Sequence, residues 1–172
     1  MLHTEIFNQQ ELFADKIKTV DELRAIVAEA RASGKKIALA NGCFDLLHVG
    51  HIRYLKGTKE FADLLIVGLN SDSSVRRLKG EGRPYITENE RMMMIAAIEY
   101  VDYVTLFEEG RVDSLLLALK PDFHAKGTDY TEQSVPEKDI VASYGGKVII
   151  TGDPKEHSST NIIEIIRNRT VC

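Results

Sequence analysis

The chain has 172 residues, of which 44% are hydrophobic and 28% charged, a composition typical of a globular domain large enough to bury a core. Its formal net charge of -4 argues against general affinity for nucleic acid or anionic membranes, although a local basic site is still allowed. With two cysteines and no long apolar run, neither a disulfide framework nor a membrane-spanning helix is expected. We therefore expect a cytoplasmic protein without nucleic-acid or membrane partners.

The pattern of residues along the chain predicts alternating helices and strands. Residues 1–18 show no clear pattern and are treated as an N-terminal extension, followed by one domain over 19–172. Capping boxes at Thr19–Glu22 and Thr87–Glu90 each predict a helix start, because their side chains satisfy unpaired backbone N–H groups. We predict helices from these boxes to Gly34 and Tyr100, further helices over 49–61, 112–119 and 161–167, a short helix within 71–84, and strands over 35–41, 63–70, 101–107, 123–127 and 147–151.

This alternation predicts an α/β fold of the Rossmann-like type, a doubly wound sheet of five parallel strands with helices on both faces. The segments 35–41 and 63–70 are continuously apolar, as expected for strands that are covered on both sides. In such sheets, ligands bind outside the carboxyl ends of the strands, where the strand order reverses. Polar and glycine-containing segments follow most of the predicted strands, so we expect these segments to meet at one edge of the sheet.

The stretch NGCFDLLHVGHIRYL (41–55) places His48 and His51 at the start of a predicted helix. At this spacing both imidazoles lie on one helix face, and Gly50 between them allows close approach to the backbone. A helix N-terminus attracts anions, to which histidines can donate hydrogen bonds. One alternative is zinc binding with Cys43, but HExxH and CxxC motifs are absent. A second is one packed and one solvated histidine. Phosphate binding is the interpretation that these residues favour.

Three further segments could contact an anionic substrate, and each also has a simpler explanation. HSSTNII (157–163) offers hydroxyl and N–H groups at a helix start, but serines there are also ordinary N-caps. RRLKGEGR (76–83) is basic and could equally be a solvated loop, and KGTDY (126–130) could contact a base or ribose or form a plain turn. The chain has neither GxxxxGK[ST] nor GxGxxG, so the common triphosphate and nicotinamide-dinucleotide loops are absent.

Several segments together resemble the HxGH nucleotidyltransferase superfamily in order and spacing: GCFDLLHVGHIRYL, LNSDSSVRRLKGEGRP, ERMMMIAAIEYVDYV, KGTDY and SSTNII. The resemblance covers about residues 18–168 and is closest to the stand-alone D-glycero-β-D-manno-heptose 1-phosphate adenylyltransferases, the ADP-heptose synthases. Glycerol-3-phosphate and ethanolamine-phosphate cytidylyltransferases share the same layout. The chain departs from the family where it has KGTDY in place of the common KGGDY, and DPKEH where an Arg often precedes the serines.

The resemblance implies a role for each matching residue. His48 and His51 would contact nucleotide phosphates and stabilise the transition state, and the other catalytic residues would be Lys79 and Arg91, both on phosphate. The nucleotide- and substrate-binding residues would be Asn41, Gly42, Cys43, Phe44, Asp45, Gly50, Asn70, Asp72, Arg83, Lys126, Gly127, Asp129, Tyr130, Ser158, Ser159 and Thr160. No residue is expected to hold a resident metal ion, because Mg²⁺ would be carried by the nucleoside triphosphate. A homodimer is expected for the superfamily.

The implied reaction is attack by a sugar-phosphate oxygen on the α-phosphorus of a nucleoside triphosphate, with pyrophosphate leaving. The nucleophile is already anionic at neutral pH, so the site needs positioning and charge compensation more than a general base. We therefore predict transfer of AMP from ATP to D-glycero-β-D-manno-heptose 1-phosphate, for lipopolysaccharide or other heptose-containing glycans. The alternatives are a CTP-dependent enzyme acting on an alcohol phosphate such as glycerol 3-phosphate, and a nucleotide-binding module without turnover.

Overall fold

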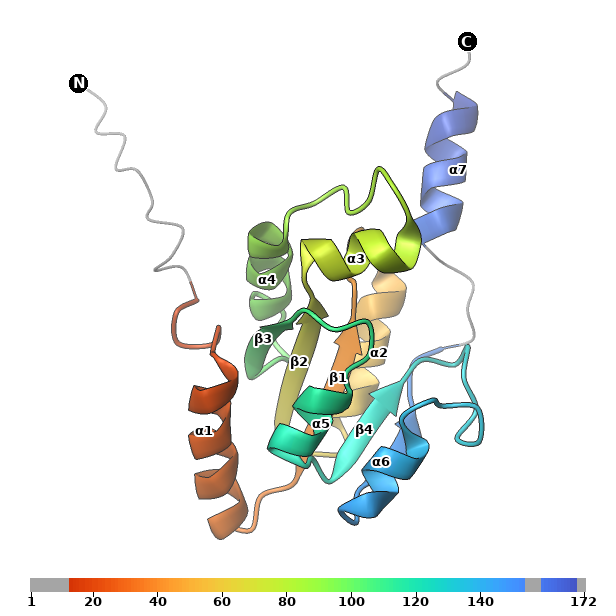
Figure 1. Ribbon diagram of the computed structural model, residues 1–172. Coiled ribbons are helices and arrows are strands. Elements are labelled where there is room, and N and C mark those ends of the chain that lie inside the picture. Colours follow the sequence, from red (N-terminus) through yellow and green to blue (C-terminus); the bar gives the residue numbers. More distant parts are fainter. Residues whose placement is uncertain (1–12, 154–158, 170–172) are drawn as a thin grey trace, which may run out of the picture.

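A computed structural model describes residues 13–153 and 159–169, and Figure 1 shows a central sheet with helices packed on both of its faces. The sheet contains five parallel strands: β1 (Ile37–Gly42), β2 (Leu64–Asn70), β3 (Tyr103–Phe107), β4 (Phe123–Lys126) and β5 (Lys147–Ile150). Their order is β3-β2-β1-β4-β5, so the chain builds outward from β1 in one direction and then from β4 in the other. The predicted doubly wound α/β fold is confirmed.

The helices agree with the sequence pattern except at two places. They are α1 (Val20–Ala32), α2 (Val49–Lys59), α3 (Asp72–Lys79), α4 (Glu88–Ala96), α5 (Asp113–Leu119), α6 (Lys138–Ser143) and α7 (Ser159–Arg169). Both predicted capping boxes are present, but α4 ends at Ala96 and does not reach Tyr100. The six residues of α6 are too few to show a clear helical period, and the sequence pattern does not predict this helix. No helix among the described residues is long and apolar enough to cross a lipid bilayer.

Alternate residues of β1 belong to two cores, one on each face of the sheet. Ile37 and Leu39 pack with residues of α1, α5 and α6, whereas Ala38 and Ala40 pack with residues of α2 and α4. All four side chains are completely buried. A strand covered on both faces must be apolar at every position, which explains the continuous apolar run in this part of the sequence.

The residues before α1 contact the edge strand β3. Ile17 forms an isolated parallel bridge with Val104, the N–H of Lys18 donates to the carbonyl of Val104 at 2.9 Å, and the N–H of Val104 donates to the carbonyl of Lys16 at 3.0 Å. The ammonium of Lys16 also donates to the carbonyl of Val101 at 2.9 Å. This part of the stretch 1–18 is therefore paired with the sheet.

Candidate active site

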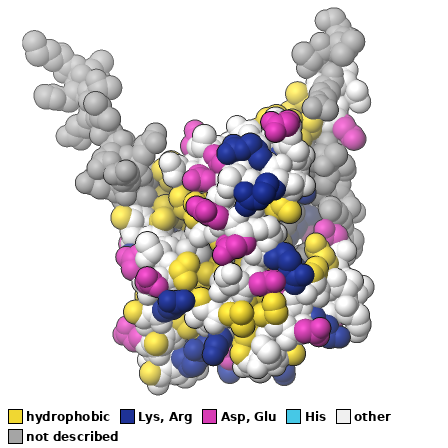
Figure 2. All heavy atoms as spheres, in the orientation of Figure 1, with side chains coloured by type: hydrophobic (Ala, Val, Ile, Leu, Met, Phe, Trp, Pro, Cys, Tyr) yellow, Lys and Arg dark blue, Asp and Glu magenta, His cyan; other side chains and the backbone are white. Residues whose placement is uncertain are grey.

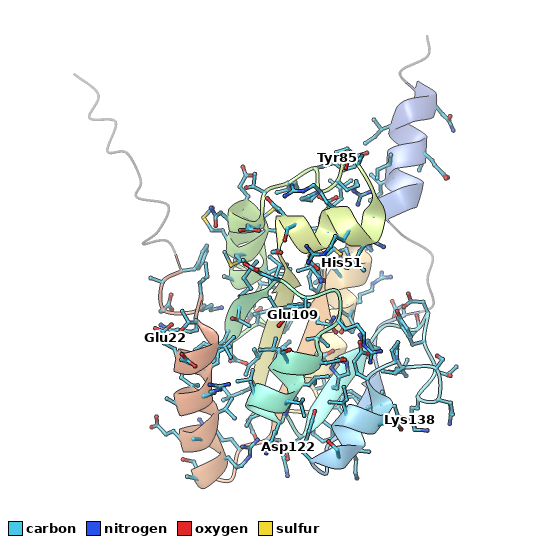
Figure 3. The ribbon with its side chains drawn as sticks, viewed as in Figure 1. Glu22, His51, Tyr85, Glu109, Asp122 and Lys138 are labelled. Atoms are coloured by element: carbon cyan, nitrogen blue, oxygen red, sulfur yellow. The ribbon has the colours of Figure 1, made fainter. Side chains whose placement is uncertain are left out.

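The predicted site residues that the structure describes lie at or near the carboxyl ends of β1, β2 and β4. The strand order reverses between β1 and β4, which is where a doubly wound sheet binds its ligands. Basic side chains lie over α3, at this end of the sheet, with acidic side chains beside them (Figure 2). In Figure 3, His51 lies at the same end of the sheet, with the loop that carries Tyr85 above it in that view.

The two histidines of the HxGH motif form a stacked pair at the start of α2. His48 is the N-cap and His51 is the third helical residue, and their ring centroids are 3.9 Å apart with 27° between the planes. The backbone N–H of His48 donates to Nδ1 of His51 at 3.4 Å, so the proton of the neutral His51 ring lies on Nε2. Phe44 packs against the same ring edge to face, with the centroids 5.1 Å apart. The Nε2–H group of His51 is therefore a positioned hydrogen-bond donor.

The surroundings of His51 favour its neutral form. Burial and, to a smaller extent, the neighbouring His48 lower the pKa of His51 to about 4. At neutral pH the ring is therefore uncharged and donates through Nε2. A bound triphosphate would bring negative charge beside the ring and raise this pKa, because an opposite charge favours the protonated form.

We expect the unliganded protein to lose stability as the pH falls from 6.5 towards 4. The pKa of His51 is about 4 in the folded protein, against an ordinary histidine value of 6.5 for the unfolded chain. The unfolded chain therefore binds more protons than the folded protein in this range, so the free energy of unfolding decreases as the pH is lowered. Burial also lowers the pKa of His124, which contributes with the same sign. Urea denaturation at several pH values measures the effect, and His51→Gln should reduce it. An identical pH dependence in the variant would contradict the assignment to His51.

Arg91 of α4 is completely buried and joins the carboxyl ends of β1 and β2 to the loop that precedes α4. Its Nη1 donates to the carbonyl oxygens of Cys43 at 2.5 Å and Asn70 at 2.9 Å, and its Nη2 donates to the carboxylate of Asp72 at 2.7 Å. Its Nε donates to the carbonyl of Ile86 at 2.9 Å. The guanidinium therefore faces the ends of β1 and β2 from inside the protein, unlike the direct phosphate contact that the resemblance implies.

Asp45 is enclosed by the loop 83–86. Its Oδ1 accepts hydrogen bonds from the backbone N–H groups of Tyr85 at 2.7 Å and Ile86 at 3.1 Å, and its Oδ2 accepts one from Nε of Arg83 at 2.5 Å. The carboxylate side chain is 1% exposed and that of Arg83 is 17% exposed. The guanidinium of Arg83 also lies 4.7 Å from the centroid of the Tyr85 ring. In this structure Asp45 holds the loop and presents no free carboxylate to a substrate.

We expect Asp45→Asn to release the loop 83–86. The amide keeps only one acceptor oxygen, so its NH₂ group must face either the two backbone N–H groups or Arg83, and a buried hydrogen bond lost in this way costs about 1–3 kcal/mol. Amide hydrogen exchange of Tyr85 and Ile86 should become faster. Asp122→Asn is the matched control, because Asp122 lies beside Lys36 at the amino ends of the strands. It should leave the exchange rates of these two amides unchanged. Unchanged protection of Tyr85 in Asp45→Asn would contradict the anchoring role.

The thiol of Cys43 lies among the cations of the site. Burial raises its pKa, while the positive charges of Lys79 and of the two arginines described above act in the opposite direction, Lys79 most strongly. Lys79 is exposed at the end of α3, so its ammonium is accessible to a ligand. The side-chain amide of Asn70 supports neighbouring side chains: its oxygen accepts a hydrogen bond from the Cys43 thiol at 3.8 Å, and its NH₂ group donates to the Ser74 hydroxyl at 3.0 Å.

The segment KGTDY lies on the other side of β1, at the end of β4. The ammonium of Lys126 donates to Oδ1 of Asn41 at 3.0 Å and lies 5.6 Å from the centroid of the Tyr130 ring. The N–H of Tyr130 donates to the carbonyl of Gly127 at 3.0 Å, which closes a tight turn. A Cβ atom at Gly127 would lie 2.8 Å from Oδ1 of Asp129, so a side chain there would require the Asp129 carboxylate to move. The structure thus brings the KGTDY segment next to Asn41.

The remaining predicted residues divide into two groups. Gly42 ends β1 and Gly50 lies in the first turn of α2, both at the carboxyl edge of the sheet. Ser158 and the side chains of Ser159 and Thr160 lie outside the described residues. Within residues 13–153 and 159–169, no three His, Cys, Asp or Glu side chains are grouped so that they could hold a metal ion.

A family model described as cytidylyltransferase-like matches residues 39–165. The chain belongs to the cytidylyltransferase-like family. The bifunctional protein HldE of Geobacter metallireducens is 51% identical to it over 151 residues, which are 88% of this chain and 31% of that protein. HldE of Syntrophotalea carbinolica is 45% identical over 168 residues, 98% of this chain and 34% of the relative. The chain therefore spans about a third of the length of these curated relatives.

Two solved structures resemble this cytidylyltransferase-like chain. The lipopolysaccharide core biosynthesis protein from Thermoplasma volcanium is 30% identical with a TM-score of 0.62, and the match covers 71% of this chain and 100% of that one. Pantoate-beta-alanine ligase from Francisella tularensis, described as complexed with beta-gamma ATP and beta-alanine, has a TM-score of 0.62 at 19% identity, over 89% of this chain and 77% of that one, and shares the fold. The predicted membership of a nucleotidyltransferase family is confirmed.

Two buried polar residues beside Lys126 in this cytidylyltransferase-like chain are missing from the residues predicted by sequence. His124 is 0% exposed and Glu137, at the start of α6, is 4% exposed. His124 lies two residues before Lys126 on a strand, and this period of two was the available signal that both share a face. Glu137 carries no comparable signal, because it belongs to the helix that the sequence pattern does not predict.

Proposed function

We propose that this chain transfers AMP from ATP to D-glycero-β-D-manno-heptose 1-phosphate, giving ADP-heptose and pyrophosphate. The observation that carries this proposal is the stacked pair of His48 and His51, with the Nε2–H donor of His51 at the start of α2. A donor of this kind can compensate the charge that develops on the α-phosphate as the sugar-phosphate oxygen attacks and pyrophosphate leaves. No proton has to be removed from the anionic nucleophile.

The other polar residues have complementary roles in this proposal. Lys79 and Arg83 neutralise phosphate charge from α3 and the following loop, and Asp45 keeps that loop in place. Arg91 acts as a positioning residue, because its guanidinium holds the ends of β1 and β2 together from inside. This assignment replaces direct phosphate contact by Arg91 with support of the backbone around the site.

We also assign the remaining contacts, from the motifs that resemble the HxGH nucleotidyltransferases. Gly127, Asp129 and Tyr130 border the base and ribose, while Ser158, Ser159 and Thr160 contact phosphate. Mg²⁺ arrives on the triphosphate and keeps several of its water ligands, and it contributes neutralisation of the phosphate charge. A homodimer remains our expectation, to be measured by light scattering.

The choice of substrate rests on the sequence motifs and on the relatives. The motif set resembles heptose 1-phosphate adenylyltransferases, and the solved relative at 30% identity is described as a lipopolysaccharide core biosynthesis protein. Both support a sugar phosphate as the acceptor. The description of the family as cytidylyltransferase-like keeps CTP with an alcohol phosphate as the second candidate.

The test is pyrophosphate release by the purified chain with ATP or CTP and a panel of acceptors. We expect turnover with ATP and D-glycero-β-D-manno-heptose 1-phosphate, and much slower turnover with the α-anomer, with hexose 1-phosphates and with glycerol 3-phosphate. A preference for CTP and glycerol 3-phosphate would favour the second candidate. Tight binding of ATP without product from any acceptor would contradict an enzymatic function and would favour a nucleotide-binding module.

A further inference from the structure

A buried polar row lies on the face of the sheet that α5 and α6 cover. Its members are His124 and Lys126 on β4 and Glu137 at the start of α6, which are 0%, 9% and 4% exposed. Because successive strand residues alternate between faces, His124 and Lys126 point to the same side of β4. Buried charges are costly unless they are paired, so this row calls for an explanation in terms of its contacts.

Lys126 links this row to the carboxyl end of β1. Its ammonium lies 3.2 Å from the carboxylate of Glu137 and 3.0 Å from Oδ1 of Asn41, and Nε2 of His124 lies 3.7 Å from the same carboxylate. An ammonium group has donors only, so the oxygen of the Asn41 amide must face it. The NH₂ group of Asn41 is therefore turned away from Lys126, at a half-buried position beside the point where the strand order reverses.

The charges in the row are balanced. Burial lowers the pKa of His124, which keeps its ring neutral at neutral pH. Burial alone would raise the pKa of Glu137, but the His124 ring and the Lys126 ammonium lower it to about 2. One carboxylate thus faces one ammonium, and removal of the carboxylate charge would leave the buried ammonium without its counter-ion.

We propose that Glu137 is a positioning residue of the active site: it holds Lys126, and Lys126 fixes the Asn41 amide so that its NH₂ group donates to the bound nucleotide. This proposal deepens the proposed function and rests on it. Glu137 is the N-cap of α6, Lys126 ends β4 and Asn41 lies in β1. The contacts among these three residues therefore link the start of a helix that carries no motif residue to the nucleotide.

A double-mutant cycle tests the coupling. Glu137→Gln keeps the shape of the side chain and removes its charge, and Asn41→Ala removes the donor. We expect each single change to raise the KM for MgATP about tenfold with a smaller effect on kcat, and the double variant to be little worse than Asn41→Ala alone, because residues in one network are not additive. Lys126→Gln is the second variant, should Glu137→Gln fold poorly, and circular dichroism checks folding in each case.

The matched control is Asp102→Asn. Its carboxylate pairs with the ammonium of Lys59 at 2.6 Å and accepts from the N–H of Leu65 at 2.7 Å, away from the carboxyl ends of the strands. If Glu137 has only a structural role, Glu137→Gln and Asp102→Asn should both lower the stability and leave the KM for MgATP unchanged. If Glu137 positions the site, Glu137→Gln should raise this KM and Asp102→Asn should not.

Calorimetric measurement of MgATP binding separates this inference from the proposed function. If the wild type turns over but the losses of Glu137→Gln and Asn41→Ala multiply in the double variant, the coupling is overturned and the function stands. If the wild type binds MgATP without turnover, the proposed function fails. The dissociation constants for MgATP of the two single variants and the double variant then test the coupling in place of the KM values. A wild type that does not bind MgATP overturns both.

Discussion

His51→Ala should lower kcat by about 100- to 1000-fold, with a smaller change in the KM for ATP, because a preorganised donor to developing charge acts mainly in the transition state. The structural basis is the hydrogen bond from the His48 backbone to Nδ1 of His51, which leaves Nε2 as the donor. Steady-state pyrophosphate release measures both constants. Equal kcat values for the wild type and His51→Ala would remove His51 from the chemistry.

A pair of amide substitutions tests which ring nitrogen acts. The side-chain nitrogen of Gln reaches about as far as Nε2 of histidine, whereas that of Asn reaches only about as far as Nδ1. We therefore expect His51→Gln to keep part of the activity that His51→Asn loses. The opposite ranking would place the active donor on Nδ1 and contradict the assigned proton position.

The second large effect is expected for Arg91→Met, which should lower the free energy of unfolding by about 3–5 kcal/mol. Methionine approximates the length of the arginine but leaves the carbonyl groups of Cys43 and Asn70 and the carboxylate of Asp72 without their donor. The side chain of Arg91 is 0% exposed, so water cannot replace these contacts without a rearrangement. Urea denaturation followed by circular dichroism measures the loss.

Two variants show whether the geometry of Arg91 matters. Arg91→Lys should recover little stability, because a single ammonium cannot span acceptors that the planar guanidinium contacts from three of its nitrogens. Arg24→Met is the control: this side chain is 57% exposed on α1 and pairs with the exposed Asp21, so its removal should change stability by less than about 0.5 kcal/mol. Wild-type stability in Arg91→Lys would contradict the role assigned here.

The local elements were predictable because their signals are local. Thr19 with Glu22 and Thr87 with Glu90 form the capping boxes that their spacing predicts. The run at β1 is apolar at every position because both faces of the strand are covered. The closeness of the histidine pair was also predictable, although His48 is the N-cap and not a helical residue, since the side chains of an N-cap residue and of the third helical residue are neighbours.

The environments of individual side chains were not predictable. Asp45 and Arg83 are 38 positions apart, yet their side chains meet at 2.5 Å. The resemblance assigned Arg91 to phosphate, and only the meeting of β1, β2 and α4 shows that it is buried. Glu137 belongs to a helix too short to recognise, and its contact with Lys126 depends on how α6 packs beside the sheet.

The sequence by itself determined the five strands, every helix except α6, and the set of residues that follow the strands, because each of these depends on neighbours within a few positions. The family followed from the order and spacing of several such segments along the chain. The tertiary structure decided which of those residues face a ligand and which support the backbone from within. That division depends on partners distant in the chain, as for Arg91 and Asp45, and a local pattern of polar and apolar residues does not identify such partners.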